Sequence, residues 1–191
     1  MSDVLVVVDC QYDFIDGSLA CENAFNAVNN NIDYINKHDD LKVYYSADGH
    51  KITHHSFTVN NHGGTWPVHC VAGTHGAELH QDFYNKILKP ENRPDKLRNI
   101  YFKACEDETD EYSAFNAKNY NNKALHDEID LNHDNVIVAG IASEFCVRET
   151  LLAFFKNNYK VKLLADALAW VNHDGHVKNL DDLKSQGVEI I

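Results

Sequence analysis

The stretch V-I-V-A-G-I-A-S-E-F-C-V-R-E-T, residues 136–150, joins an uncharged apolar run to a helical pattern. The first five residues predict a buried strand that ends at Gly140. Residues 145–158 predict a helix, whose apolar stripe is formed by Val147, Leu151, Leu152, Phe154 and Phe155. A strand that leads directly into a helix is the building unit of a parallel α/β sheet.

Short apolar runs and helical patterns alternate along most of the chain. Strands are predicted at residues 4–9, 41–47, 99–103, 135–139, 161–165 and 188–191. Helices are predicted at residues 22–37, 116–129, 145–158 and 176–187, the last of them closed by Gly187. This order indicates right-handed crossovers, so we expect an α/β fold with three α/β/α layers and a six-stranded, mainly parallel sheet.

The chain has 191 residues, which suits a single domain over residues 1–191. Residues 48–77 are rich in Gly, His, Asn and Thr and show little periodicity. An irregular segment of this length is uncommon as an idle connection, so we expect a functional excursion there.

Composition limits the classes of partner. The net charge is −12, without a basic cluster, which argues against nucleic-acid binding. No apolar run is long enough to span a membrane, and the N-terminus lacks the basic region of a signal peptide. Five cysteines without paired spacing fit a reducing compartment. We therefore expect a cytoplasmic protein with a small-molecule substrate and no nucleic-acid or membrane partner.

Reactive side chains follow four of the predicted strands. They are Asp9 after the first, Asp48 and His50 after the second, Lys103 at the end of the third, and Cys146 after the fourth. The carboxyl ends of parallel strands meet at one edge of a sheet, so these side chains should converge. Each has an ordinary explanation when taken alone, such as a capping carboxylate, a strand-end lysine or an inert buried thiol.

Cys146 is the candidate nucleophile. It falls near a helix start, where free N–H groups and the helix dipole favour a thiolate. The small residues Gly140-Ile141-Ala142-Ser143 before it allow a tight turn whose N–H groups could face an oxyanion.

A metal site is the second chemical prediction. Asp48 and His50 lie two residues apart after a strand, and His69 would complete a set of one carboxylate and two imidazoles. Such a set suits Zn²⁺, Fe²⁺ or Mn²⁺ with open coordination positions. Three further candidates lie nearby, namely His54, His55 and His62, while four other histidines are predicted on the surface: His75, His80, His173 and His176.

Several motifs together resemble one enzyme family. They are D-C-Q-Y-D-F-I-D-G-S-L-A (9–20), S-A-D-G-H (46–50), W-P-V-H-C (66–70), D-E-Y-S-A-F (110–115) and G-I-A-S-E-F-C-V (140–147). In this combination the chain resembles the nicotinamidases and pyrazinamidases of the isochorismatase-like cysteine hydrolases. The likeness extends over almost the whole chain and implies the isochorismatase-like hydrolase fold.

The resemblance also implies roles for individual residues. The catalytic residues would be Asp9, Lys103 and Cys146, and the oxyanion would be held by the N–H groups of Ala142 and Cys146 after a cis Ile141–Ala142 bond. The metal ligands would be Asp48, His50 and His69, whereas His54 could ligate directly or through water. The aromatic walls of the substrate pocket would be Phe14, Trp66 and Tyr112.

The implied activity is metal-dependent hydrolysis of nicotinamide, and of pyrazinamide, through a thioester intermediate in NAD salvage. Zinc is the cofactor expected first, with iron or manganese as alternatives. A same-family hydrolase of a carbamoyl or ureido compound, and a non-catalytic metal-binding protein, remain the competing interpretations. Relatives occur as monomers and as oligomers, so a homo-oligomer is compatible with the sequence.

The chain departs from the family pattern at three positions. Ala104 replaces the usual glycine after the lysine, Glu111 replaces a serine, and Gly49 replaces an aromatic residue. These changes predict an added charge at the pocket rim and a more open wall.

Overall fold

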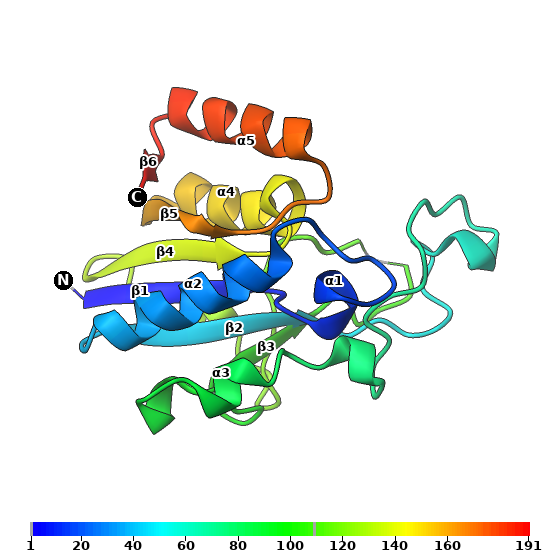
Figure 1. Ribbon diagram of the computed structural model, residues 1–191, viewed down its shortest axis with the longest axis horizontal. Coiled ribbons are helices and arrows are strands. Elements are labelled where there is room, and N and C mark those ends of the chain that lie inside the picture. Colours follow the sequence, from blue (N-terminus) through cyan, green and yellow to red (C-terminus); the bar gives the residue numbers. More distant parts are fainter. Residues whose placement is uncertain (1, 109) are drawn as a thin grey trace.

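The computed structural model describes residues 2–108 and 110–191, and its centre is one six-stranded sheet (Figure 1). The strand order is β3-β2-β1-β4-β5-β6, and every neighbouring pair is parallel. The sheet predicted from the sequence is thus confirmed. Its strands are β1 (Ser2–Val8), β2 (Lys42–Asp48), β3 (Ile100–Lys103), β4 (Asp134–Gly140), β5 (Lys160–Leu168) and β6 (Glu189–Ile190).

Helices cover both faces of the sheet and form the outer layers. The cluster on one face contains α2 (Ala24–Lys37) with α1 (Tyr12–Ile15) and α3 (Asp82–Asn85). The cluster on the other face contains α4 (Arg148–Lys156) and α5 (His173–Ser185). Residues of β1 alternate between the two clusters, which explains why its sequence is apolar throughout.

The strand order reverses between β1 and β4, the place where open α/β sheets bind ligands beyond the strand ends. Gly140 ends β4 with φ +117°, and a Cβ there would lie 2.2 Å from the Val8 carbonyl oxygen. Only glycine allows this approach, so the residues after β1 and β4 begin side by side. The excursion after β2 lies beyond the same carboxyl ends of the strands (Figure 1).

The predicted helix over residues 116–129 is wrong. The Lys118 main chain pairs with Phe102 on the edge of β3, and Asn122 has φ +60°. The Asn119 side chain accepts the N–H groups of Asn121 and Lys123, which stabilises a turn. Asparagine competes in this way with helical hydrogen bonds, and only Leu125–Glu128 forms a short 3₁₀ helix.

Other elements differ from the sequence prediction mainly at their ends. The helix expected over 145–158 is divided into a π-helical turn, Ser143–Val147, followed by α4. Helix α5 begins earlier than expected because the Asn172 side chain caps it by accepting the Gly175 N–H. Short helices α1 and α3 were not predicted. No helix among the described residues has the length and apolar character needed to cross a membrane.

Candidate active site

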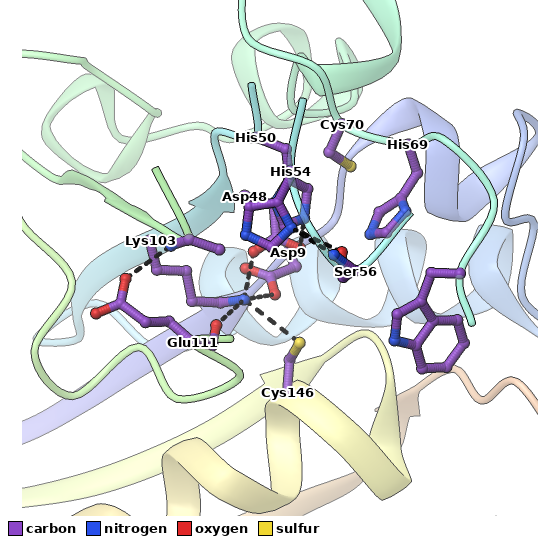
Figure 2. A network of polar contacts seen from close by, with 12 residues as sticks. Asp9, Asp48, His50, His54, Ser56, His69, Cys70, Lys103, Glu111 and Cys146 are labelled. Atoms are coloured by element: carbon purple, nitrogen blue, oxygen red, sulfur yellow. Dashed lines mark hydrogen bonds and ion pairs between the residues drawn. The ribbon is translucent and has the colours of Figure 1, made fainter. Parts of the chain in front are cut away.

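The Lys103 ammonium lies at the centre of a buried polar cluster (Figure 2). Its Nζ is 2.5 Å from Asp48 Oδ1, 2.9 Å from Asp9 Oδ2 and 3.4 Å from Cys146 Sγ. A fourth contact, at 3.2 Å, is to the main-chain oxygen of Glu111. Lysine and the two carboxylates are each no more than 5% exposed. The structure therefore brings together one reactive side chain from the end of each of the first four strands, namely Asp9, Asp48, Lys103 and Cys146.

The charges in this cluster support one another. Burial alone would lower the pKa of Lys103, but Asp48 and Asp9 raise it well above its usual value. Burial alone would raise the pKa of Asp48, but Lys103 and His50 hold it below its usual range. Lys103 is therefore a fixed cation and Asp48 a fixed anion at neutral pH.

Asp9 differs from Asp48 because burial raises its pKa in spite of the neighbouring Lys103. The Ser46 hydroxyl donates to Asp9 Oδ1 at 2.6 Å and fixes the carboxylate. A carboxylate with a raised pKa is a stronger base than an ordinary one, and one oxygen of Asp9 lies within 4.8 Å of Cys146 Sγ. Asp9 is therefore a candidate base for the Cys146 thiol.

Cys146 lies in the π-helical turn that precedes α4, with 7% of its surface exposed. Burial raises the pKa of its thiol well above the usual value, although Lys103 opposes this. The thiolate expected from the helix start is therefore not the favoured resting form. Burial, with the nearby Asp9 and Asp48 carboxylates, opposes ionisation of the thiol more than Lys103 favours it, so a base would assist its reaction.

The backbone before Cys146 can face a substrate oxygen. The Ile141–Ala142 peptide bond is cis, as the resemblance implies. Ala142 lines the same pocket as Cys146, and its N–H donates to none of the described residues. An unpaired N–H on a residue that lines the same pocket as Cys146 is a candidate oxyanion donor.

A separate group of side chains fits a divalent cation. Asp48, His50 and His69 each offer one ligand atom within 4.8 Å of the others, and all three are buried. His69 Nδ1 contacts the Pro67 carbonyl oxygen at 2.8 Å, so Nδ1 carries the hydrogen and Nε2 keeps its lone pair. Burial lowers the pKa of His69, which keeps the ring neutral, as a metal ligand must be.

One further observation supports the fit of a metal here. His50 Nδ1 is buried and has no hydrogen-bond partner among the described residues, an arrangement that needs an explanation in a buried site. Two neutral imidazoles and one carboxylate form the donor set of zinc sites with an open position. The residues therefore fit the cation that the sequence predicts.

The remaining histidines have different surroundings. His54 is fully buried beside His50, with ring centroids 4.4 Å apart, and its Nδ1 lies 2.7 Å from Ser56 Oγ. Its ligand nitrogens group with His55 and Asp110 rather than with the set around His50. The surface placement of His80 and His176 is wrong, since both are buried.

His80 and His176, which were predicted on the surface, are buried by contacts with other segments of the chain. The His80 N–H donates to the Cys10 carbonyl, and its ring lies 5.1 Å from that of Tyr12. The His176 ring stacks on Trp170 and lies 2.8 Å from the Ser143 hydroxyl. His75 and His173 are exposed, as predicted.

One pocket contains Cys146 together with the metal-site residues. Phe14, Trp66 and Tyr112 line it, as the resemblance implies, and the Trp66 indole N–H donates to the Tyr112 hydroxyl at 3.0 Å. Phe145 forms a further aromatic wall that sequence reasoning missed, although it directly precedes Cys146.

Two departures from the family pattern meet in space beside Lys103. Ala104 has φ +52°, the left-handed conformation that favours glycine. The Glu111 carboxylate accepts the Ala104 N–H at 2.8 Å, while the Glu111 main-chain oxygen accepts from Lys103. The glutamate thus supports the backbone turn after Lys103 as well as adding charge to the pocket rim.

Comparisons with known proteins give a consistent result. A family model described as isochorismatase domain matches residues 3–191. The nicotinamidase/pyrazinamidase of Mycobacterium tuberculosis is 28% identical, over 98% of this chain and 97% of that protein. The pyrazinamidase of Pyrococcus horikoshii in complex with zinc is 30% identical with a TM-score of 0.82, covering 100% of this chain and 99% of that one. PnC1 of L. infantum in complex with nicotinate is 29% identical with a TM-score of 0.78, covering 100% and 92%.

Proposed function

Because the chain belongs to the isochorismatase domain family, we propose that it is a metal-dependent nicotinamidase that also accepts pyrazinamide. The observation that carries the proposal is the position of Lys103 Nζ, in contact with Asp9, Asp48 and Cys146 in one pocket. The named activities and the nicotinate complex of the relatives support the substrate class. The whole chain acts as one domain in this proposal.

The chain's own residues account for both halves of an amide hydrolysis. Asp9 accepts the Cys146 proton as Sγ attacks the carboxamide carbon, and Lys103 stabilises the sulfur anion that forms. The N–H groups of Ala142 and Cys146 hold the oxyanion. Asp9 then delivers its proton to the departing ammonia, which leaves a thioester on Cys146. Asp9 finally removes a proton from the water that attacks the thioester, the C–S bond breaks to release the carboxylic acid, and the proton returns from Asp9 to the Cys146 sulfur.

Asp48, His50 and His69 would hold the metal ion, with zinc as the first choice. When bound, it would supply a Lewis acid that orients the ring nitrogen of the substrate. Trp66, Phe145 and Phe14 would enclose the flat ring between apolar walls and keep bulk water away from the sulfur atom. Asp48 contacts both Lys103 and His50, so the metal site and the catalytic lysine share one carboxylate.

An ammonia-release assay on metal-analysed protein tests the proposal. We expect turnover of nicotinamide and pyrazinamide, loss of activity after chelation, and recovery when zinc, iron or manganese is returned. Faster turnover of carbamoyl or ureido compounds would instead show that another small amide is the substrate. Full activity in verified metal-free protein would contradict the metal requirement.

The pH dependence provides a further prediction. Asp9 must be ionised to accept the thiol proton, and burial raises its pKa above the ordinary 3.8. We therefore expect kcat/KM to fall as the pH falls through a midpoint above 3.8, because protonated Asp9 cannot act as the base. Steady-state assays across pH, with bound zinc measured at each point, check this. If the loss of rate follows the loss of zinc instead, the fall of kcat/KM at low pH does not report the protonation of Asp9.

A further inference from the structure

The Gln11 side chain continues the pairing between β1 and β2 beyond the end of β1. Its Oε1 accepts the Asp48 N–H at 2.8 Å, and its Nε2 donates to the Asp48 carbonyl at 2.9 Å. The second hydrogen on Nε2 is donated to the Ala77 carbonyl at 2.8 Å. Gln11 is fully buried, so its amide is satisfied entirely by these main-chain groups. It thus binds both main-chain polar groups of Asp48, the N–H and the carbonyl.

The Asp13 side chain makes a matching contact with the second metal-site segment. Its Oδ2 accepts the N–H of Cys70, the residue after His69, at 2.6 Å. Cys70 has φ +46°, so the chain turns sharply directly after His69, and the hydrogen bond fixes that turn. Asp13 Oδ1 also accepts the Ser18 N–H at 3.3 Å, which orients the carboxylate.

Gly76 shows how closely this contact is built. A Cβ at position 76 would lie 2.1 Å from Asp13 Oδ2, so any larger residue would displace the carboxylate. Gly76 and Ala77 belong to one short 3₁₀ helix, His75–Ala77, which Gln11 and Asp13 therefore both touch. The segment that follows His69 is packed onto the segment that follows Asp9.

Neither Gln11 nor Asp13 lines the pocket, so neither can touch a substrate there. Their partners are the main chains of Asp48 and of the residue after His69. We propose that Gln11 and Asp13 are positioning residues that set the geometry and affinity of the metal site through Asp48 and His69. This inference rests on the metal site of the proposed function. It also gives a reason why Asp9, Gln11 and Asp13 lie on one short stretch of chain: the base and the metal ligands share a support.

Zinc affinity of the Asp13 variants tests the proposal without an activity assay. Competition with a chromophoric chelator should show that Asp13→Ala binds zinc about tenfold or more weakly, the usual effect of losing a residue that orients a ligand. Asp13→Asn should keep most of the affinity, because its amide oxygen can still accept the Cys70 N–H. The absorption spectrum of the cobalt-substituted protein should change in Asp13→Ala. Asp16→Asn, on the exposed end of the same segment, is the matched control and should behave as wild type.

Two further variants keep the test decisive if Asp13→Ala folds poorly. Gly76→Ala leaves the Asp13 carboxylate chemically intact but pushes it away from the Cys70 N–H. Gln11→Met keeps a side chain of similar length but removes its three hydrogen bonds. Both variants should bind zinc more weakly. Alkylation of Cys146 in metal-free protein, followed by peptide mapping, should proceed at the wild-type rate in every variant.

Native zinc affinity and cobalt spectra in Asp13→Ala and Gly76→Ala would overturn the proposal. It would also be overturned if the alkylation rate and the melting temperature changed in proportion to zinc affinity, since that marks a general structural role. A protein that binds zinc in this pattern but hydrolyses no amide would refute the proposed function and leave this inference standing.

Discussion

Replacing Cys146 by alanine is expected to lower kcat/KM for nicotinamide by at least about 10⁴-fold, because removal of a nucleophile leaves only the contribution of binding and the oxyanion donors. The metal content should not change, since Asp48, His50 and His69 form the ligand group without the sulfur atom. Ammonia release and metal analysis on the same sample measure both quantities. Mass spectrometry of acid-quenched wild-type protein should also show the acyl adduct on the peptide that contains Cys146.

A matched control is Cys105→Ala. Cys105 is the one partly exposed cysteine among the described residues, and its thiol hydrogen bonds only to the Lys103 carbonyl. Its removal should leave turnover close to wild type. If Cys146→Ala retained near-native rates, the attacking group would be a water molecule and the thioester pathway would be incorrect. If Cys105→Ala were the inactive variant, the nucleophile would have been assigned to the wrong strand end.

Replacing Lys103 by methionine is expected to abolish turnover and to destabilise the fold. The variant leaves the buried Asp9 and Asp48 carboxylates without their cation, and breaking a buried ion pair in this way costs about 3–5 kcal/mol. The sulfur anion also loses the contact at 3.4 Å that stabilises it. Denaturant unfolding measures the stability, and ammonia release measures the rate.

The pH dependence of this loss distinguishes a charge effect from a packing effect. Without Lys103, the pKa of Asp9, which burial already raises, should rise further. A carboxyl whose pKa is higher in the folded than in the unfolded chain binds protons more tightly when folded, so the folded state loses stability as the pH rises. The deficit of Lys103→Met should therefore be larger at about pH 8 than at about pH 5.

Lys51→Met provides the control for that experiment. Lys51 forms an exposed ion pair with Glu106 at 3.3 Å, with its side chain 53% exposed. Exposed pairs contribute little, so the unfolding free energy should change by less than about 0.5 kcal/mol. A Lys103→Met deficit that does not vary with pH would show that the lost aliphatic packing, rather than the uncompensated carboxylates, causes the destabilisation.

The sheet and the convergence of the reactive residues could be predicted because each depends on local pattern. Uniformly apolar runs such as Val4–Val8 indicate strands covered on both faces, and the structure places them there. The residues that follow such strands must meet at one edge whatever the rest of the chain does. Asp9, Asp48, Lys103 and Cys146 could be brought together by this rule alone.

Where prediction failed, contacts between distant segments decided the outcome. Residues 116–129 have a helical pattern, but the edge of β3 offered the Lys118 main chain a partner 16 positions away, at Phe102. Burial of His80 and His176 also comes from other segments, by packing against Tyr12 and Trp170. A residue's own neighbours in sequence carry no information about such partners.

The sequence by itself determined which reactive residues follow which strands. It thereby placed a base, a cation, a thiol and a set of metal ligands at one edge of the sheet. Only the tertiary structure decided their electrostatic state. Burial raises the pKa of both Cys146 and Asp9 around one lysine, and the cost of burying charge depends on all the atoms packed around a group. For the same reason the supporting contacts of Gln11 and Asp13 became visible only in the fold, since their partners, Asp48 and Cys70, lie 37 and 57 positions along the chain.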